Sequence, residues 1–200
     1  MMIEAGGGMD DITGRLARRL RQEREARSWS LADLAERSNV SRAMISKIER
    51  GEASPTAELL NRLATGFGLT LASIFAEADP GLDPAAPRVA RGAEQAEWRD
   101  PGTGYLRRNV SPPGAPALEI VEVQFPAGGR VVFDAYHETR IVQQLWLLEG
   151  AMELAVGDAT FHLSAGDCLA MTLDRPVIFH NPGETPARYA VVLARPETRR

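Results

Sequence analysis

The segment HETRIVQQLWLLEG, residues 137–150, contains side chains whose types and spacing could do chemistry. In a β-strand, alternate residues point to the same face. One face of this segment would then carry polar side chains followed by aliphatic ones: His137, Thr139, Ile141, Gln143, Leu145 and Leu147. Such a face is suited either to a metal site, where imidazole binds the ion, or to a pocket for an organic molecule.

A second group of chemically useful side chains lies in SRAMISKIER, residues 41–50. If this segment is a helix, its methionine and isoleucines form an apolar face, and four side chains point elsewhere: Arg42, Ala43, Ser46 and Lys47. Arginine can span O6 and N7 of guanine, alanine can contact a thymine methyl, and lysine reaches guanine or phosphate. Ser30 and Ser41, at expected helix starts, and Arg50 are candidates for binding DNA phosphates.

The composition indicates a globular protein that acts in the cytoplasm. The 200-residue chain is 44% hydrophobic, which is sufficient for a packed core. No apolar run approaches the roughly 18 residues of a membrane span, and MMIEAGGGMDD lacks the apolar segment of a signal peptide. We expect residues 1–11 to be a loose N-terminus and the chain to have no membrane partner. The single cysteine, Cys168, excludes an internal disulfide and is interpreted as a small buried thiol.

The net charge of −4 is unevenly distributed. Residues 79–200 carry 12 basic and 16 acidic side chains, so the preceding part of the chain is neutral overall. Within that part, six arginines occur close together: Arg15, Arg18, Arg19, Arg21, Arg24 and Arg27. A local basic stripe of this kind permits contact with DNA at one end of the protein.

Two periodicities divide the chain into two domains. Over residues 12–77 apolar residues recur at helical spacing, and the pattern predicts five helices. Three of the expected N-caps carry hydroxyl groups: Ser30, Ser41 and Thr56. Residues 78–87, ADPGLDPAAP, hold three prolines and are expected to be a linker. Over residues 88–200, short strand-length segments separated by glycine-containing turns predict a β-sandwich or barrel.

The segment SLADLAERSNVSRAMISKIERG resembles the helix-turn-helix of the phage-repressor-type (XRE-like) DNA-binding family. Pro55 and the continuation LLNRLATGFGLTL match the family as well, so that the resemblance covers roughly residues 12–77. It implies an all-α domain whose third helix, residues 41–49, reads double-stranded operator DNA. It also implies that Arg24 pairs with Glu49 and thereby orients this helix; a solvated surface arginine is the alternative.

The segments PAGG, HETRIVQQLWLLEG and LSAGDCLAMTLDRPVIFHNPG, in this order, resemble the two motifs of the cupin family. The match covers about residues 118–194 and implies a cupin β-barrel, that is, a double-stranded β-helix or jelly roll. Residues 88–112 are similar to the leading strands of regulators with this double architecture. The chain is therefore expected to be a multidomain α and β protein.

The cupin resemblance also bears on metal binding. The family usually binds its metal through two histidines spaced HxH, a glutamate, and a histidine of the second motif. His137 falls on the first of these positions, but Thr139, Gln143 and Val177 fall on the other three. Threonine and valine cannot serve as ligands, and a neutral amide is a poor substitute for a carboxylate on a first-row metal. We therefore expect no metal and no cofactor.

The same positions are still suited to a pocket for an organic effector. Apolar walls with a few convergent polar groups are typical of small-molecule sites. The predicted lining combines both motifs: His137, Thr139, Gln143, Leu145, Leu147, Val177 and Phe179. A barrel filled by its own side chains is the alternative.

Together the two resemblances predict a transcription regulator that is not an enzyme. Its helical domain would bind operator DNA, and its barrel would bind a small-molecule effector and support a homodimer, because such domains usually bind two half-sites. Two alternatives stay open. One is a DNA-binding dimer whose barrel is purely structural. The other is a cupin oxygenase or epoxidase with a helical domain, which would require non-haem iron held by two histidines and a carboxylate.

Overall fold

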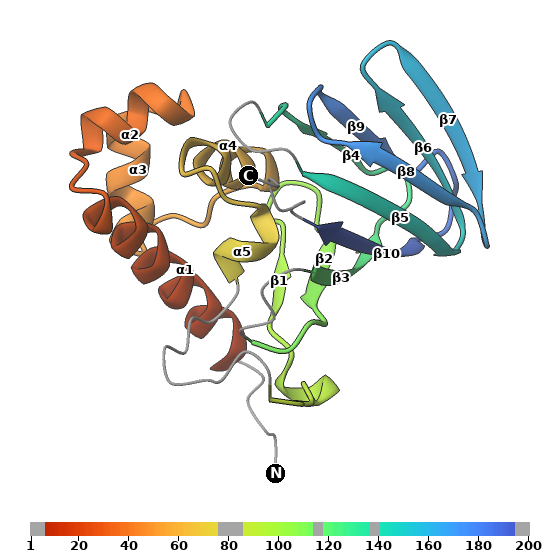
Figure 1. Cartoon of the computed structure of the whole chain (residues 1–200), viewed down its shortest axis with the longest axis horizontal. Helices are drawn as coiled ribbons and strands as arrows, with labels where there is room; N and C mark the ends of the chain where they lie inside the picture. The colour runs from red at the N-terminus through yellow and green to blue at the C-terminus, as the bar shows by residue number, and fades with distance from the viewer. Residues whose placement is uncertain (1–6, 76–85, 114–117, 137–140, 195–200) are drawn as a thin grey trace.

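The structure, a computed structural model, describes residues 7–75, 86–113, 118–136 and 141–194, with side chains from Ile12 onward. Helices form the N-terminal half and strands form the rest, and the two halves lie side by side (Figure 1). Within the described residues, no helix combines the length and the apolar character needed to cross a membrane.

Five helices form the N-terminal half, as the sequence predicted. They are α1 (Gly7–Ala26), α2 (Leu31–Ser38), α3 (Arg42–Glu49), α4 (Ala57–Gly66) and α5 (Leu71–Phe75). α1 begins earlier than expected, since residues 7–11 were predicted to be part of a loose N-terminus. A glycine costs a helix only about 1 kcal/mol relative to alanine, so a helix already formed further along can extend through it. Most of the expected linker, residues 78–87, lies outside the described residues.

Hydroxyl side chains begin three of these helices, at the predicted positions. The side-chain oxygens of Ser30, Ser41 and Thr56 accept hydrogen bonds from backbone amides three residues later, at 3.2, 3.3 and 3.4 Å. Each bond satisfies one of the amides that a helix start leaves without a partner. Between α2 and α3, Asn39 adopts the left-handed conformation (φ 52°) and produces the tight break of the helix-turn-helix.

The strand half consists of two antiparallel sheets. The six-stranded sheet has the order β1-β2-β3-β10-β5-β8, and the four-stranded sheet the order β4-β9-β6-β7. The strands are β1 (Glu97–Arg99), β2 (Leu106–Asn109), β3 (Leu118–Phe125), β4 (Arg130–Phe133), β5 (Val142–Glu149), β6 (Ala151–Val156), β7 (Ala159–Ser164), β8 (Cys168–Thr172), β9 (Val177–His180) and β10 (Ala187–Ala194). The predicted leading strands correspond to β1 and β2, which extend the larger sheet next to β3. This architecture confirms the expected cupin barrel.

Inward-facing residues of both sheets form the barrel core. Strand alternation is regular in β10, where every second side chain is buried. Leu145 and Leu147 on its partner strand β5, and Leu154 on β6 of the other sheet, are fully buried. Aromatic rings contact one another in sequence from the helical half into the barrel: Phe75, Trp98, Tyr105, Phe125, Tyr189, Phe179 and Phe133.

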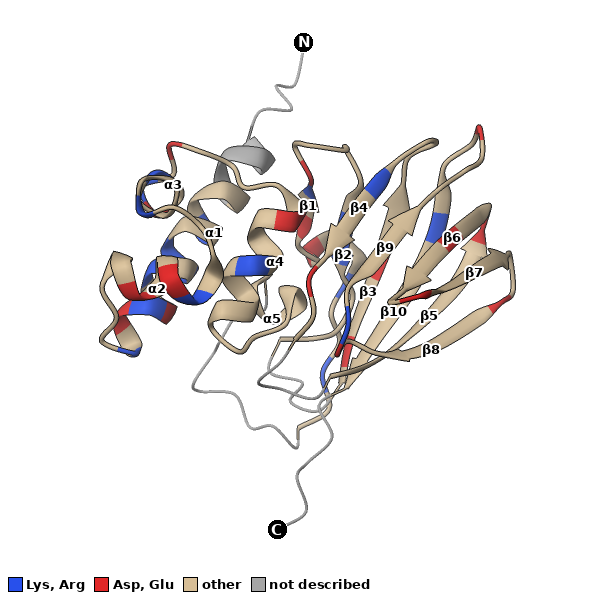
Figure 2. Ribbon diagram, turned by 90° about the horizontal axis from the view of Figure 1, so that it is seen from above, with Lys and Arg blue, Asp and Glu red and all other residues tan. Residues whose placement is uncertain are grey.

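Polar contacts join the helical half to the barrel along α4 and α5. The carboxylate of Asp100 accepts a hydrogen bond from the first amide of α4 (2.9 Å), and Glu119 accepts from the hydroxyls of Thr70 (2.7 Å) and Ser73 (2.8 Å). Figure 2 shows the consequence: α4 and α5 lie against the sheets, while α2 and α3 lie at the far end of the molecule. The helix-turn-helix therefore lies away from the barrel, in a helical half that contacts the barrel through α4 and α5.

Candidate functional site

Helix α3 presents the predicted DNA-contacting side chains to solvent. Its isoleucines, Ile45 and Ile48, are each 1% exposed and pack into the helical core. The remaining predicted residues lie on the other side of the helix; Arg42, Ala43 and Lys47 are exposed and Ser46 is half-buried. Within the described part of the chain, the side chains of Arg42 and Lys47 form no hydrogen bond or ion pair, so their donors are available to a ligand.

An ion pair fixes α3 to α1. The guanidinium of Arg24 donates two hydrogen bonds to the carboxylate of Glu49, from Nε (2.8 Å) and from Nη2 (2.7 Å), and a third from Nη1 to the carbonyl of Trp29 (2.9 Å). Both side chains are largely buried, and the hydrogen bond to Glu49 raises the pKa of Arg24. The pairing implied by the family resemblance is confirmed, and it sets the orientation in which α3 presents its outer face.

The predicted phosphate-binding residues differ in whether their hydrogen-bond donors are already engaged. The hydroxyl of Ser41 accepts only from the amide of Met44, so its own proton is available. Ser30, in contrast, donates its hydroxyl to the carboxylate of Asp33 at 2.8 Å, and this bond lowers the pKa of Asp33. The negative charge of Asp33 would repel a phosphate that approached Ser30.

Arg50 is also engaged. Its Nε and Nη2 donate to the two carboxylate oxygens of Glu52 at 2.6 and 2.7 Å, and its Nη1 donates to the hydroxyl of Ser46. A phosphate would have to compete with Glu52 for this guanidinium, since both anions use the same donors.

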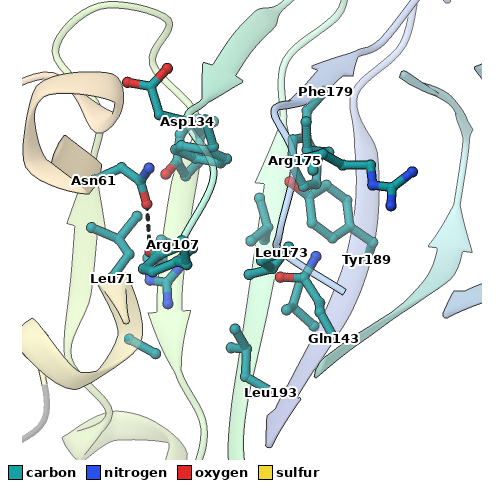
Figure 3. A pocket seen from close by; sticks show the side chains of 17 residues that line it. Asn61, Leu71, Arg107, Asp134, Gln143, Leu173, Arg175, Phe179, Tyr189 and Leu193 are labelled. Atoms are coloured by element: carbon teal, nitrogen blue, oxygen red, sulfur yellow. Dashed lines mark hydrogen bonds between the residues drawn. The ribbon is translucent and has the colours of Figure 1, made fainter. Parts of the chain in front are cut away.

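A cavity of about 50 Å³ lies where α4 and α5 meet the interior of the barrel (Figure 3). It is lined from the helical half by Asn61 and Leu71, and from the barrel by strands of both sheets. Three of the predicted effector-pocket residues line it: Gln143, Val177 and Phe179.

The other predicted pocket residues are placed differently. Leu145 and Leu147 do not line this cavity; they are fully buried and fill the barrel core. They lie on the predicted face of β5, but farther along the strand than the cavity reaches. His137 and Thr139 lie outside the described residues.

The sequence did not point to several polar residues that line the cavity. Tyr136 donates its hydroxyl to Oδ1 of Asn61 at 2.6 Å. Gln143, which the sequence did predict, places Nε2 4.0 Å from the sulfur of Met171. Arg107, on β2, is 8% exposed, and its Nε and Nη2 have no hydrogen-bond partner. The motifs did not single out Asn61, Tyr136 or Arg107 as pocket residues, so only their convergence in the fold identifies them.

All three tyrosines of the chain, Tyr105, Tyr136 and Tyr189, line the cavity. Burial raises the pKa of each phenol, because the phenolate would lose its hydration. The pKa of Tyr136 is raised to about 12. The cavity therefore favours neutral phenols, and its one interior cation is Arg107 among the described side chains.

The described side chains do not fit an iron site. Gln143 and Val177 occupy two of the family's metal-ligand positions and provide neither imidazole nor carboxylate. Within the described ranges, no three His, Cys, Asp or Glu side chains are arranged to hold a metal ion.

Two histidines and the single cysteine lie on the barrel surface. His162 and His180 each place Nδ1 3.5 Å from an oxygen of Glu153, on the outer face of the four-stranded sheet. Cys168 was expected to be buried, and this prediction is wrong: the thiol is exposed. β8 is an edge strand of the six-stranded sheet, and its outward side chains have no layer over them in the single chain.

Comparison with known proteins agrees with this architecture. Residues 20–74 match the helix-turn-helix family model, and residues 121–193 match the cupin-domain model. The HTH-type transcriptional regulator SutR of Escherichia coli (strain K12) is 27% identical over 192 residues, which are 95% of this chain and 100% of that relative. PuuR, another E. coli (strain K12) HTH-type regulator, is 25% identical over 166 residues, or 82% of this chain and 86% of PuuR.

A solved structure shows the same fold along nearly the whole chain. The crystal structure of an HTH_3 family transcriptional regulator from Vibrio cholerae superposes with a TM-score of 0.75 at 24% identity, covering 94% of this chain and 99% of that one. The matches place the chain in the class of DNA-binding transcriptional regulators. Within that class, it belongs to the XRE-type helix-turn-helix regulators that carry a C-terminal cupin domain.

Proposed function

We propose that this regulator acts in the cytoplasm as a homodimer, binds a two-part operator in double-stranded DNA, and responds to a small organic effector held in its metal-free barrel. It has no enzymatic activity in this proposal. The observation that supports it best is the outer face of α3, where Arg42 and Lys47 have free donors on a helix that the Arg24–Glu49 pair holds in place.

Direct reading of bases is assigned to α3. Arg42, Ala43, Ser46 and Lys47 face a major groove, and Ser41 binds phosphate at the N-terminus of the helix. Ser30 and Arg50 contribute less, because Asp33 and Glu52 already occupy their donors.

Dimerisation is assigned to the exposed outer face of the six-stranded sheet. Trp146 on β5 is 51% exposed and lies opposite Cys168 on the edge strand β8. A large exposed aromatic side chain beside an uncovered sheet edge is typical of a protein–protein interface. Burying Trp146 against a second copy would supply the two-fold symmetry that two half-sites require.

Effector binding is assigned to the cavity because it contacts both halves of the chain. A ligand there touches α4 and α5 of the helical half and both sheets of the barrel. For regulation, it must bind the DNA-competent and DNA-incompetent arrangements with unequal affinity. A purely structural barrel would leave operator affinity independent of any small molecule.

The test is operator selection followed by affinity measurement with matched arginine variants. Arg42→Ala should weaken binding by about 1–3 kcal/mol and relax base preference at one position of each half-site. The control, Arg91→Ala, removes an exposed arginine of the barrel half and should leave affinity unchanged. A single unpaired half-site in footprinting, or an intact sequence preference in Arg42→Ala, would contradict the proposal.

A further inference from the structure

Arg107 is an arginine buried inside the fold. It lies in β2 opposite Trp98 of β1 and Val123 of β3, and its side chain faces inward. Figure 3 shows its guanidinium within the cavity lining, with Asn61 and Leu71 of the helical half nearby. Burial lowers the pKa of this guanidinium, yet arginine keeps its charge in proteins. A full positive charge is therefore enclosed here.

The two unpartnered atoms of Arg107, Nε and Nη2, form one edge of the guanidinium. Arg24 and Arg50 use this same pair of atoms to hold the two oxygens of a carboxylate. Parallel N–H donors at this spacing match a carboxylate in a two-point contact. The free edge of Arg107 therefore has the same donor arrangement that binds a carboxylate in the Arg24–Glu49 and Arg50–Glu52 pairs.

The neighbouring carboxylates of the protein do not fill this role. Glu119 accepts hydrogen bonds from two hydroxyls of the helical half, and Asp100 accepts from its own turn and from the start of α4. Asp134, which lines the cavity, has an exposed side chain that pairs with Arg62 at 3.2 Å. Within the described residues, Arg107 forms no ion pair; its guanidinium contacts the hydroxyl of Tyr105 and lies 5.9 Å from the centre of the Phe75 ring, and neither group carries a negative charge. Buried charged groups are normally paired, so an unpaired one calls for a partner from outside the chain.

A second donor beside Arg107 is also unused. Nδ2 of Asn61, on α4, is buried without a partner, and Asn61 lines the same cavity. The remaining walls are mostly aliphatic or aromatic, among them Val123, Val177 and Leu193. The site thus combines a two-point anion contact from the barrel, one amide donor from the helical half, and an apolar enclosure.

We propose that the effector is a small monocarboxylate whose head binds Nε and Nη2 of Arg107. This inference rests on the proposed function and names the chemical class of its ligand. A water molecule needs roughly 10–15 Å³, and the cavity has about 50 Å³ by the same measure. The cavity therefore holds a ligand of roughly three to five non-hydrogen atoms. A phosphate dianion is disfavoured, since the buried guanidinium of Arg107 would balance only one of its two charges. Arg175 also lines the cavity, but its side chain is 57% exposed and pairs with Asp174. Contact with Asn61 links the ligand to α4.

The test measures thermal stability and calorimetric binding of the full-length protein with propionate and, as its neutral counterpart of the same shape, propionamide. A ligand this small reaches micromolar affinity at best, so both are supplied at millimolar concentrations. At about 100-fold excess over Kd, propionate should raise the Tm by about 5–10 °C, and propionamide should not. Acetate should behave like propionate, whereas inorganic phosphate and chloride should have no such effect.

Matched variants assign the binding to the guanidinium edge. Arg107→Met should weaken propionate binding about 10- to 100-fold, and Arg107→Lys, which keeps the charge without the paired donors, should weaken it by an intermediate factor. Arg108→Met removes the same charge from the next residue, whose side chain pairs with Glu122 away from the cavity, and should bind propionate as the parent does. Circular dichroism confirms that each variant is folded.

Three results would overturn the inference: equal stabilisation by propionamide, equal stabilisation by chloride or phosphate, or unchanged propionate binding in folded Arg107→Met. Operator affinity, measured with and without ligand, separates this inference from the proposed function. A neutral effector that still controls DNA binding in Arg107→Met leaves the proposed function standing and removes this inference. Propionate that binds through Arg107 without any change in operator affinity supports the carboxylate site and contradicts the regulatory part of the proposed function.

Discussion

Tyr136 of the barrel half donates a hydrogen bond to Asn61 of α4 across the contact between the two halves, at 2.6 Å with both side chains buried. The same two residues line the cavity. A ligand that shifts Tyr136 or competes for Asn61 would therefore change the packing of α4 against the barrel. Because α4 also packs directly against α2, that change would reach the helix-turn-helix.

Tyr136→Phe should lower the free energy of unfolding by about 1–3 kcal/mol, because it leaves a buried amide oxygen without its partner. Urea denaturation at neutral pH measures this. In a double-mutant cycle with Asn61→Leu, the second substitution should cost less in the Tyr136→Phe background than alone. Strictly additive costs would mean that the bond contributes nothing across this contact.

Arg107→Met should raise the free energy of unfolding of the ligand-free protein by about 1–4 kcal/mol, since it replaces a buried charge that has no ion-pair partner among the described residues with an apolar side chain of similar length. The measurement is urea denaturation in a buffer without carboxylates. Arg108→Met is the matched control and should change stability by no more than about 1 kcal/mol, as expected for a partly exposed ion pair. A loss of stability in Arg107→Met would show that the guanidinium has a stabilising partner inside the fold.

Ionisation of the three buried tyrosines should destabilise the folded protein at alkaline pH. In the folded protein their pKa values are raised by burial above the value near 10 of an unfolded chain. The neutral phenols thus contribute stability that is complete below about pH 10 and is lost as the pH rises toward the folded values. Each phenol removes about 1.4 kcal/mol of stability per pH unit in that window.

We expect phenolate absorbance to appear in one cooperative step that coincides with the loss of circular dichroism above about pH 10. The chemically unfolded protein should instead titrate near pH 10 without such a step. Tyrosines that ionise one at a time while the fold persists would indicate that water reaches the cavity walls.

Local sequence patterns predicted the helical half well because its determinants are local. The caps at Ser30, Ser41 and Thr56 involve atoms three residues apart, and helical spacing alone separates Ile45 and Ile48 from the exposed face of α3. In such cases both partners of the interaction lie within a few residues of each other, so a short sequence window contains them.

The cavity could be predicted only in part. Gln143, Val177 and Phe179 follow from strand alternation, but alternation does not say how deep the cavity reaches, and Leu145 fills the core instead. Arg107 was missed because YLRRNV offers two adjacent arginines, and the sequence alone does not tell which one faces inward. That choice depends on pairing with distant strands.

The last prediction concerns Glu52, whose carboxylate holds Nε and Nη2 of Arg50 at the end of α3. Hydrogen bonding from Arg50 lowers the pKa of Glu52, so that the carboxylate stays ionised at neutral pH and opposes an approaching phosphate. Glu52→Gln removes this charge and frees the arginine. Under the proposed function, DNA affinity should rise equally for operator and unrelated sequences, because phosphate contacts carry no base information.

The salt dependence of binding measures the same change. One additional phosphate contact should steepen the slope of log K against log salt concentration by about 0.9 for each half-site. Glu184→Gln, the same substitution at an exposed position of the barrel half, is the control and should leave the slope unchanged. If Glu52→Gln leaves the slope as it is in the parent, or strengthens binding to the operator alone, Arg50 does not reach the DNA backbone and Ser41 with the start of α3 is left as the phosphate contact.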